Sequence, residues 1–124
     1  MAKPTDSELR ILQLLWVHQP CSVRQINDLL NEDREVGYTT TLKIMQIMFE
    51  KGLVSRDTSQ RSHTYTALLQ EDDAKTGLLK EFVSNAFRGS TSQLVLSALG
   101  NGKTTQAELN EIKELIKQIE NDKS

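Results

Sequence analysis

The sequence is poor in the residues that build metal centres and catalytic sites. It has one cysteine, Cys21, among 124 residues, so an intrachain disulfide is excluded and a zinc ribbon or an iron–sulfur cluster lacks its ligands. Only two histidines, His18 and His63, could supply an imidazole, and the sequence contains no Gly-rich phosphate loop, HExxH or GxSxG motif. We therefore expect a protein that is not an enzyme and that needs no metal and no cofactor.

Long apolar segments are also missing. No run of 18 uncharged apolar residues occurs, and the N-terminus carries Asp6, Glu8 and Arg10 where a signal peptide has its apolar core. The chain is 37% apolar and 26% charged, with six glycines and two prolines, which is typical of a folded soluble protein. We expect a cytoplasmic location and no membrane partner.

The formal net charge of −2 argues against a nonspecific polycation. Residues 1–67 carry eight Lys/Arg and eight Asp/Glu, whereas residues 68–124 carry seven Lys/Arg and nine Asp/Glu. The acidic excess therefore lies in the second half, and the total leaves room for a local basic surface in the first half.

Two capping boxes mark the starts of the first two helices. Thr5 with Glu8, followed by apolar residues at helical spacing, predicts a helix over 6–18. Ser22 with Gln25 predicts a second helix over about 23–32 in the same way.

A third helix and a hairpin follow. The helix is expected to stop at Gly52, and its buried stripe consists of Thr41, Ile44, Met45, Met48 and Phe49. Two β-prone runs, 53–57 and 62–67, predict a hairpin with a polar tip. Three helices and then a hairpin are the element order of a winged helix-turn-helix domain, which we assign to residues 1–69.

The second half of the sequence predicts three further helices. Acidic residues and an apolar stripe indicate one over 71–88, Ser90 opens a short helix, and Thr105 opens the last. Three short helices share too little interior to fold well alone, so residues 70–124 are expected to form a helical dimerisation domain. A monomeric cap folded onto the first domain is the alternative. The expected dimerisation residues are Leu78, Leu79, Phe82, Leu94, Leu109, Ile112, Ile116 and Ile119. The predicted fold class is mainly α with a small β-hairpin.

The third helix carries the candidate DNA contacts once its apolar stripe faces inward. In a helix-turn-helix the N-terminal residues of this helix approach base edges in the major groove. Threonine can bond phosphate, lysine can reach phosphate or guanine, and glutamine can pair with adenine. Arg61 at the hairpin tip and Arg56 nearby are both expected to reach the sugar–phosphate backbone, and a polar hairpin end kept soluble by charge is the alternative. The outward positions of the helix are Thr39, Thr40, Lys43, Gln46, Ile47 and Glu50, and an ordinary solvated helix face is the alternative.

The run from Glu35 to Leu42, continued by Met45 and Gln46 and closed by Glu50 to Val54, resembles the BlaI/MecI/CopY penicillinase-repressor family. The resemblance covers essentially the whole chain. It implies a cytoplasmic homodimeric repressor whose N-terminal winged helix binds a palindromic operator and whose C-terminal helices pair the protomers. The resemblance also allows for a further partner, an inducing protease or ligand.

By position, the resemblance assigns the recognition-helix contacts to Thr39, Thr40, Lys43 and Gln46, and a wing contact to Arg61. Other positions depart from the family. This sequence has Ile47 where many relatives have arginine, and Lys43 where threonine is common. The tail from Lys117 lacks the paired cysteines of copper-responsive members, and Ser97-Ala98 occupies the place of the Asn–Phe bond that is cleaved in β-lactam-responsive members.

Two other functions fit the same elements. A winged-helix protein–protein adaptor is supported by the balanced charge of residues 1–67, because many DNA-binding domains are openly basic. The second alternative is a regulator that binds a small molecule in a pocket between the last three predicted helices.

Overall fold

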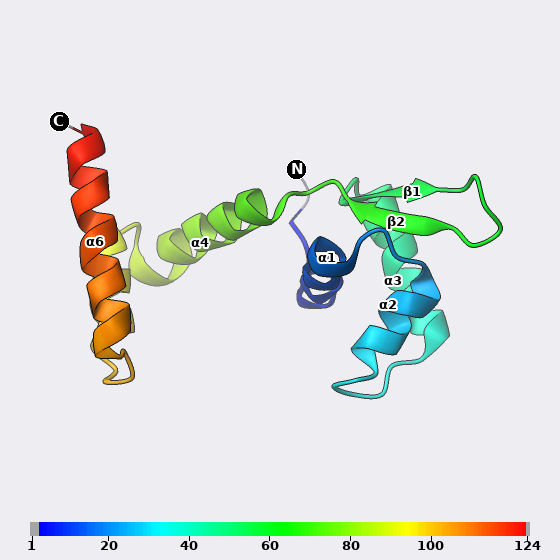
Figure 1. The fold of residues 1–124 in the computed structure, drawn as a ribbon, viewed down its shortest axis with the longest axis horizontal. Helices are drawn as coiled ribbons and strands as arrows, with labels where there is room; N and C mark the ends of the chain where they lie inside the picture. The colour runs from blue at the N-terminus through cyan, green and yellow to red at the C-terminus, as the bar shows by residue number, and fades with distance from the viewer. Residues whose placement is uncertain (1–2, 124) are drawn as a thin grey trace. The chain divides into compact units, whose positions relative to one another are not determined.

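The computed structural model describes residues 3–123, which form six helices and one two-stranded antiparallel sheet (Figure 1). The mainly α fold with a small hairpin is as predicted. The elements are α1 (Asp6–His18), α2 (Val23–Leu30), α3 (Tyr38–Glu50), β1 (Val54–Asp57), β2 (Thr64–Ala67), α4 (Glu71–Phe87), α5 (Thr91–Leu99) and α6 (Gln106–Lys123).

Both predicted capping boxes are confirmed. The Thr5 hydroxyl accepts a hydrogen bond from the Glu8 amide at 3.2 Å, and the Thr5 amide donates to Glu8 Oε1 at 2.9 Å. Ser22 and Gln25 exchange the same pair of bonds at 3.2 and 2.8 Å. Each box satisfies amides that the first turn of a helix otherwise leaves without partners, which is why α1 and α2 begin where the sequence indicates.

Helix α2 ends at Leu30, two residues before the predicted end. The side chain of Asn31 donates to the Asn27 carbonyl at 2.7 Å and to the Val36 carbonyl at 2.9 Å, and it accepts from the Val36 amide at 3.0 Å. One amide side chain therefore satisfies the end of α2 and closes the turn that leads into α3.

Helix α3 stops as predicted. Gly52 adopts a φ of +80°, and its amide donates to the Phe49 carbonyl while the Leu53 amide donates to the Met48 carbonyl. This paired arrangement is a Schellman motif, which requires the left-handed conformation that glycine adopts without strain. The chain then turns directly into β1.

The core of the first domain lies between α1, α2, α3 and the hairpin. Its fully buried side chains are Ile11, Leu12, Leu15, Ile26, Thr41, Met45, Met48, Leu53, Val54 and Tyr65. The predicted burial of Phe49 is wrong, because its side chain is 39% exposed. Phe49 lies at the edge of the α3 stripe, where the Arg56 guanidinium covers its ring at 4.3 Å from the centroid.

The hairpin pairs β1 with β2 in the register Val54 to Ala67. Cys21 extends this sheet by one residue: its amide donates to the Tyr65 carbonyl at 3.1 Å, and the Tyr65 amide donates to the Cys21 carbonyl at 2.7 Å. The start of α2 is thereby fixed to the hairpin. The Cys21 thiol is buried, which raises its pKa and keeps it protonated, as expected for an inert thiol.

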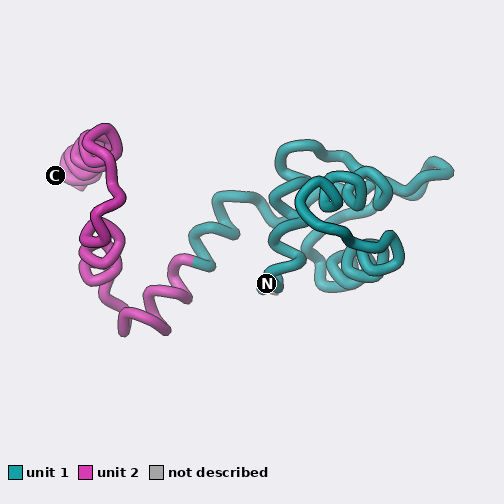
Figure 2. Tube along the Cα trace, turned by 90° about the horizontal axis from the view of Figure 1, so that it is seen from below, with its two compact units in different colours: residues 1–78 teal, residues 79–124 magenta. Residues whose placement is uncertain are grey.

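The chain divides into two compact units, residues 1–78 and 79–124 (Figure 2). The boundary falls inside α4, and Ala74 in the first half of that helix is buried in the core of the first unit. In the second unit, the Phe82 and Phe87 rings meet edge to face with centroids 5.6 Å apart. No helix among residues 3–123 is long and apolar enough to cross a membrane.

Candidate nucleic-acid interface

Helix α3 is held at both ends by polar side chains. Near its N-terminus, the fully buried Thr41 hydroxyl donates to Asn27 Oδ1 on α2 at 2.7 Å. At its C-terminus, Lys51 Nζ donates to Glu8 Oε1 on α1 at 2.7 Å. These contacts, together with the apolar core, fix how α3 is presented to solvent.

The outward face of α3 gathers four of the predicted DNA-binding residues. Thr39, Thr40, Lys43 and Gln46 are all exposed, and Ile47 beside them is 38% exposed. Residues three and four positions apart share a helix face, so Thr39, Lys43 and Gln46 form one strip of hydroxyl, ammonium and amide groups. A helix of 13 residues is about 20 Å long, enough to present this strip along a major groove.

Arg61 lies in the loop between β1 and β2 and is exposed, and this loop projects beyond the ends of the paired strands (Figure 1). The loop begins with the Ser59 amide donating to Asp57 Oδ1 at 2.9 Å. Hydrogen bonding from Ser59 and the nearby His63 lower the pKa of Asp57, so this carboxylate is ionised at neutral pH. Arg56 lies on β1, and its guanidinium lies over the ring of Phe49.

A groove of about 630 Å³ separates the first turns of α2 and α3 from the hairpin loop. It contains two residues that the sequence analysis did not identify. Arg24 in the first turn of α2 places its guanidinium over the ring of Tyr38, the first residue of α3, at 5.1 Å from the centroid. The sequence signal was an arginine two residues after the Ser22 helix cap and a tyrosine directly before the threonine run, but their proximity depends on the angle between two helices.

The predicted dimerisation residues are not buried within the chain. Leu79, Phe82, Ile116 and Ile119 are about half exposed, and Leu78 is intermediate. The other three, Leu94, Leu109 and Ile112, are also intermediate. Along α6 the spacing from Leu109 to Ile119 alternates three and four residues, which is the seam of a helix that packs on another helix.

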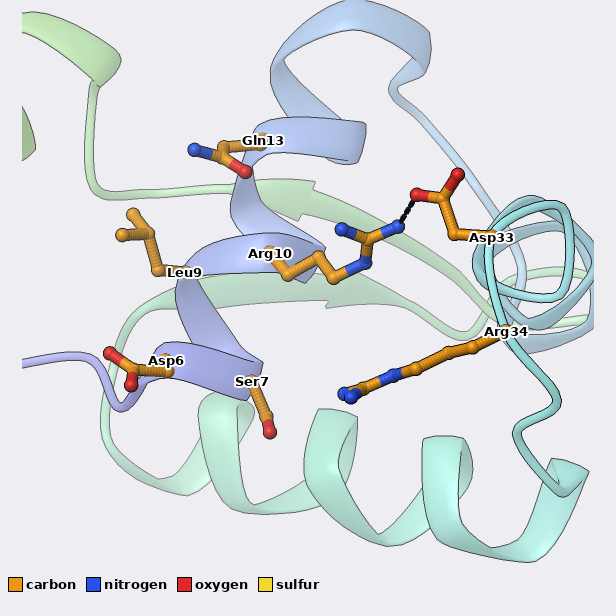
Figure 3. Close-up of a pocket in the computed structure, with 7 residues that line it drawn as sticks. All are labelled: Asp6, Ser7, Leu9, Arg10, Gln13, Asp33 and Arg34. Carbon is orange, nitrogen blue, oxygen red and sulfur yellow. Dashed lines mark hydrogen bonds and ion pairs between the residues drawn. The ribbon is translucent and has the colours of Figure 1, made fainter.

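A second hollow, of about 420 Å³, lies between α1 and the turn that joins α2 to α3 (Figure 3). Arg10 and Arg34 both extend into it, and Arg10 forms an ion pair with Asp33. Asp6 and Ser7, on the first turn of the helix that carries Arg10, also line it. Because the Arg10–Asp33 pair spans the hollow, it links α1 to the helix-turn-helix connection.

Most of the chain matches one family of known proteins. Residues 4–118 match the penicillinase repressor family. The transcriptional regulator BlaI of Mycobacterium tuberculosis (strain CDC 1551 / Oshkosh) is 30% identical over 100 residues, which cover 77% of this chain and 72% of that protein. The penicillinase repressor of Bacillus licheniformis is 21% identical over 119 residues, covering 96% of this chain and 93% of that protein.

The fold is also shared more widely. The structure of a MarR family protein from Bacillus stearothermophilus superposes with a TM-score of 0.54 at 15% identity, covering 98% of this chain and 76% of that one. The relatives are transcriptional regulators, a non-enzymatic class, in agreement with the prediction that the protein is not an enzyme. The chain belongs to the penicillinase repressor family of winged-helix transcriptional regulators.

Proposed function

We propose that the protein is a homodimeric repressor that binds a palindromic operator. In this proposal residues 1–69 form the DNA-binding domain and residues 70–124 the dimerisation domain. The observation that carries it is the exposed strip of Thr39, Lys43 and Gln46 on α3, beside the projecting hairpin loop with Arg61.

Each group on this surface has a role in the proposal. Thr39 and Thr40 lie at the N-terminus of α3, where a recognition helix comes nearest to base edges. Lys43 donates to phosphate or to guanine, Gln46 reads adenine, and Arg61 contacts the backbone from the wing. Two copies related by a two-fold axis then place their recognition helices about 34–36 Å apart, or a multiple of this.

The pairing of protomers rests on the predicted dimerisation residues, of which Leu79, Phe82, Ile116 and Ile119 in the second unit are about half exposed. Large apolar side chains left in water cost free energy, and a second copy would cover them. Linking two half-site contacts in one dimer raises the affinity for a palindrome well beyond that of one domain.

The test is a titration of labelled duplex DNA with the full chain at two salt concentrations. The duplex is taken from a selection of bound fragments of the source genome. Operator binding requires that affinity falls steeply as salt rises and that the selected sequences share a palindrome. The balanced charge of residues 1–67 favours the alternative of a protein–protein adaptor, and this alternative is supported if no duplex binds in a salt-dependent way.

A further inference from the structure

The groove between α2, α3 and the hairpin loop has the chemistry of a phosphate site. Three basic side chains line it, namely Arg24, Arg61 and His63, against one acidic side chain, Asp28. The capped N-terminus of α2 at Ser22 opens into the same groove, and the first turn of a helix favours negative charge.

The groove follows one edge of the recognition helix. Tyr38 and Leu42, four residues apart, both line it and share one side of α3. Thr39 and Lys43 occupy the next strip around the helix, which is the exposed one. A duplex that meets this strip with its major groove therefore brings one flanking phosphodiester strand alongside Tyr38, between α3 and the hairpin loop.

The Tyr38 ring already holds the Arg24 guanidinium in a position suited to such a contact. Its guanidinium rests on the Tyr38 ring at 5.1 Å, within the range in which an arginine is held by an aromatic face. A stacked guanidinium keeps the N–H groups at its rim free to donate, and two of them match two oxygens of one phosphate. Since the ring restricts the side chain before DNA arrives, less conformational entropy is lost on binding.

We propose that Arg24 binds a backbone phosphate of the operator strand that lies in this groove, and that Tyr38 is the residue that positions Arg24 for it. The inference rests on the proposed operator binding and adds to it a contact from α2, outside the recognition helix and the wing. Arg24 then contributes affinity at every sequence, whereas the strip on α3 selects the sequence.

The experiment measures binding of the full chain to its selected duplex by fluorescence anisotropy over a series of salt concentrations. Arg24→Ala should weaken binding and lower the slope of log affinity against log salt by about one unit per bound protomer. Arg24→Lys keeps the charge but loses the stacked bidentate geometry, so it should retain the slope and lose part of the affinity. Arg34→Ala is the matched control, because Arg34 lies in the other hollow and does not line the groove.

The role of Tyr38 is tested by a double-mutant cycle. Tyr38→Leu should weaken binding in the wild-type background and have little effect when Arg24 is already alanine, because its contribution acts through Arg24. Thermal unfolding of each variant checks that the domain stays folded. Replacing single phosphates of the duplex with neutral methylphosphonates should identify one position per half-site that weakens binding of the wild type but not of Arg24→Ala.

The outcomes separate the two proposals. A wild-type chain that binds no duplex in a salt-dependent way overturns operator binding itself. A wild-type chain that binds with the expected slope, together with equal slopes for Arg24→Ala and Arg34→Ala, overturns only the assignment of Arg24. Additive effects of Tyr38→Leu and Arg24→Ala would remove the positioning role from Tyr38.

Discussion

Lys51 Nζ lies 2.7 Å from Glu8 Oε1, joining residues 43 positions apart in the sequence. Glu8 belongs to the first turn of α1 and is 3% exposed, and Lys51 is the C-cap of α3. Burial alone would raise the pKa of Glu8, but the hydrogen bond and charge of Lys51, with the bond from the Thr5 amide, outweigh it and lower the pKa. The same carboxylate thus caps one helix and fixes the end of another.

This pair predicts a pH-dependent contribution to stability. Because the folded-state pKa of Glu8 is lowered, its contribution is fully present above the ordinary value of about 4.5 and is lost as pH falls through the lower, folded-state pKa. At pH 7, Glu8→Gln should reduce the free energy of unfolding by about 1.5–3 kcal/mol, the range for hydrogen bonds to charged groups. Urea unfolding at a series of pH values measures both effects. A difference between wild type and variant that stays constant down to pH 3 would contradict the assignment.

Two adjacent threonines of α3, Thr40 and Thr41, should respond differently to replacement by valine. Thr41→Val removes, at a fully buried position, the hydroxyl that donates to Asn27 Oδ1 at 2.7 Å, so it should cost about 1–3 kcal/mol of stability. Thr40→Val, its matched control, changes an exposed residue and should stay within about 0.5 kcal/mol. In a duplex titration Thr40→Val should weaken binding. Equal stability losses in the two variants would argue against the buried role of Thr41.

Helical periodicity is the reason that these threonines could be distinguished from the sequence. Thr41 falls in register with Met45 and Met48, which are buried, while Thr39 and Thr40 fall out of register with them. The capping boxes and Gly52 likewise act within a few residues, so the starts of α1 and α2 and the end of α3 followed from local physics.

Contacts between distant segments could not be predicted in this way. The Glu8–Lys51 pair and the stacking of Arg24 on Tyr38 depend on the angles at which three helices cross, which periodicity does not define. Phe49 matches the apolar stripe of α3 by spacing, yet it lies where the core ends. Its ring is covered by an arginine from β1 instead, which only the hairpin geometry reveals.

Lys43 and Gln46 should differ in how they affect DNA binding. If Lys43 contacts a phosphate, Lys43→Ala weakens binding to all duplexes and lowers the salt slope by about one unit per protomer. Gln46→Ala removes a neutral amide, so the slope should stay unchanged while discrimination at one base pair falls by about 1–3 kcal/mol. Titrations with the selected duplex and with single-base variants measure both. Unchanged affinity and slope would remove Lys43 from the interface.

The apolar seam of α6 should control both assembly and operator affinity. Ile116 and Ile119 are half exposed in the single chain, so replacing both with lysine removes little internal packing but places two charges in the proposed dimer interface. Sedimentation of this double variant should then show a monomer. The control variant Gln118→Lys, on the opposite side of α6, should remain a dimer. Affinity for the full palindrome should fall by about 10²–10⁴-fold as the two half-sites lose their linkage, whereas binding to a single half-site should be unchanged.

A double variant that sediments as a dimer would place the pairing surface elsewhere in the second unit. One that loses half-site binding as well would show that the second unit contributes to the DNA contacts themselves.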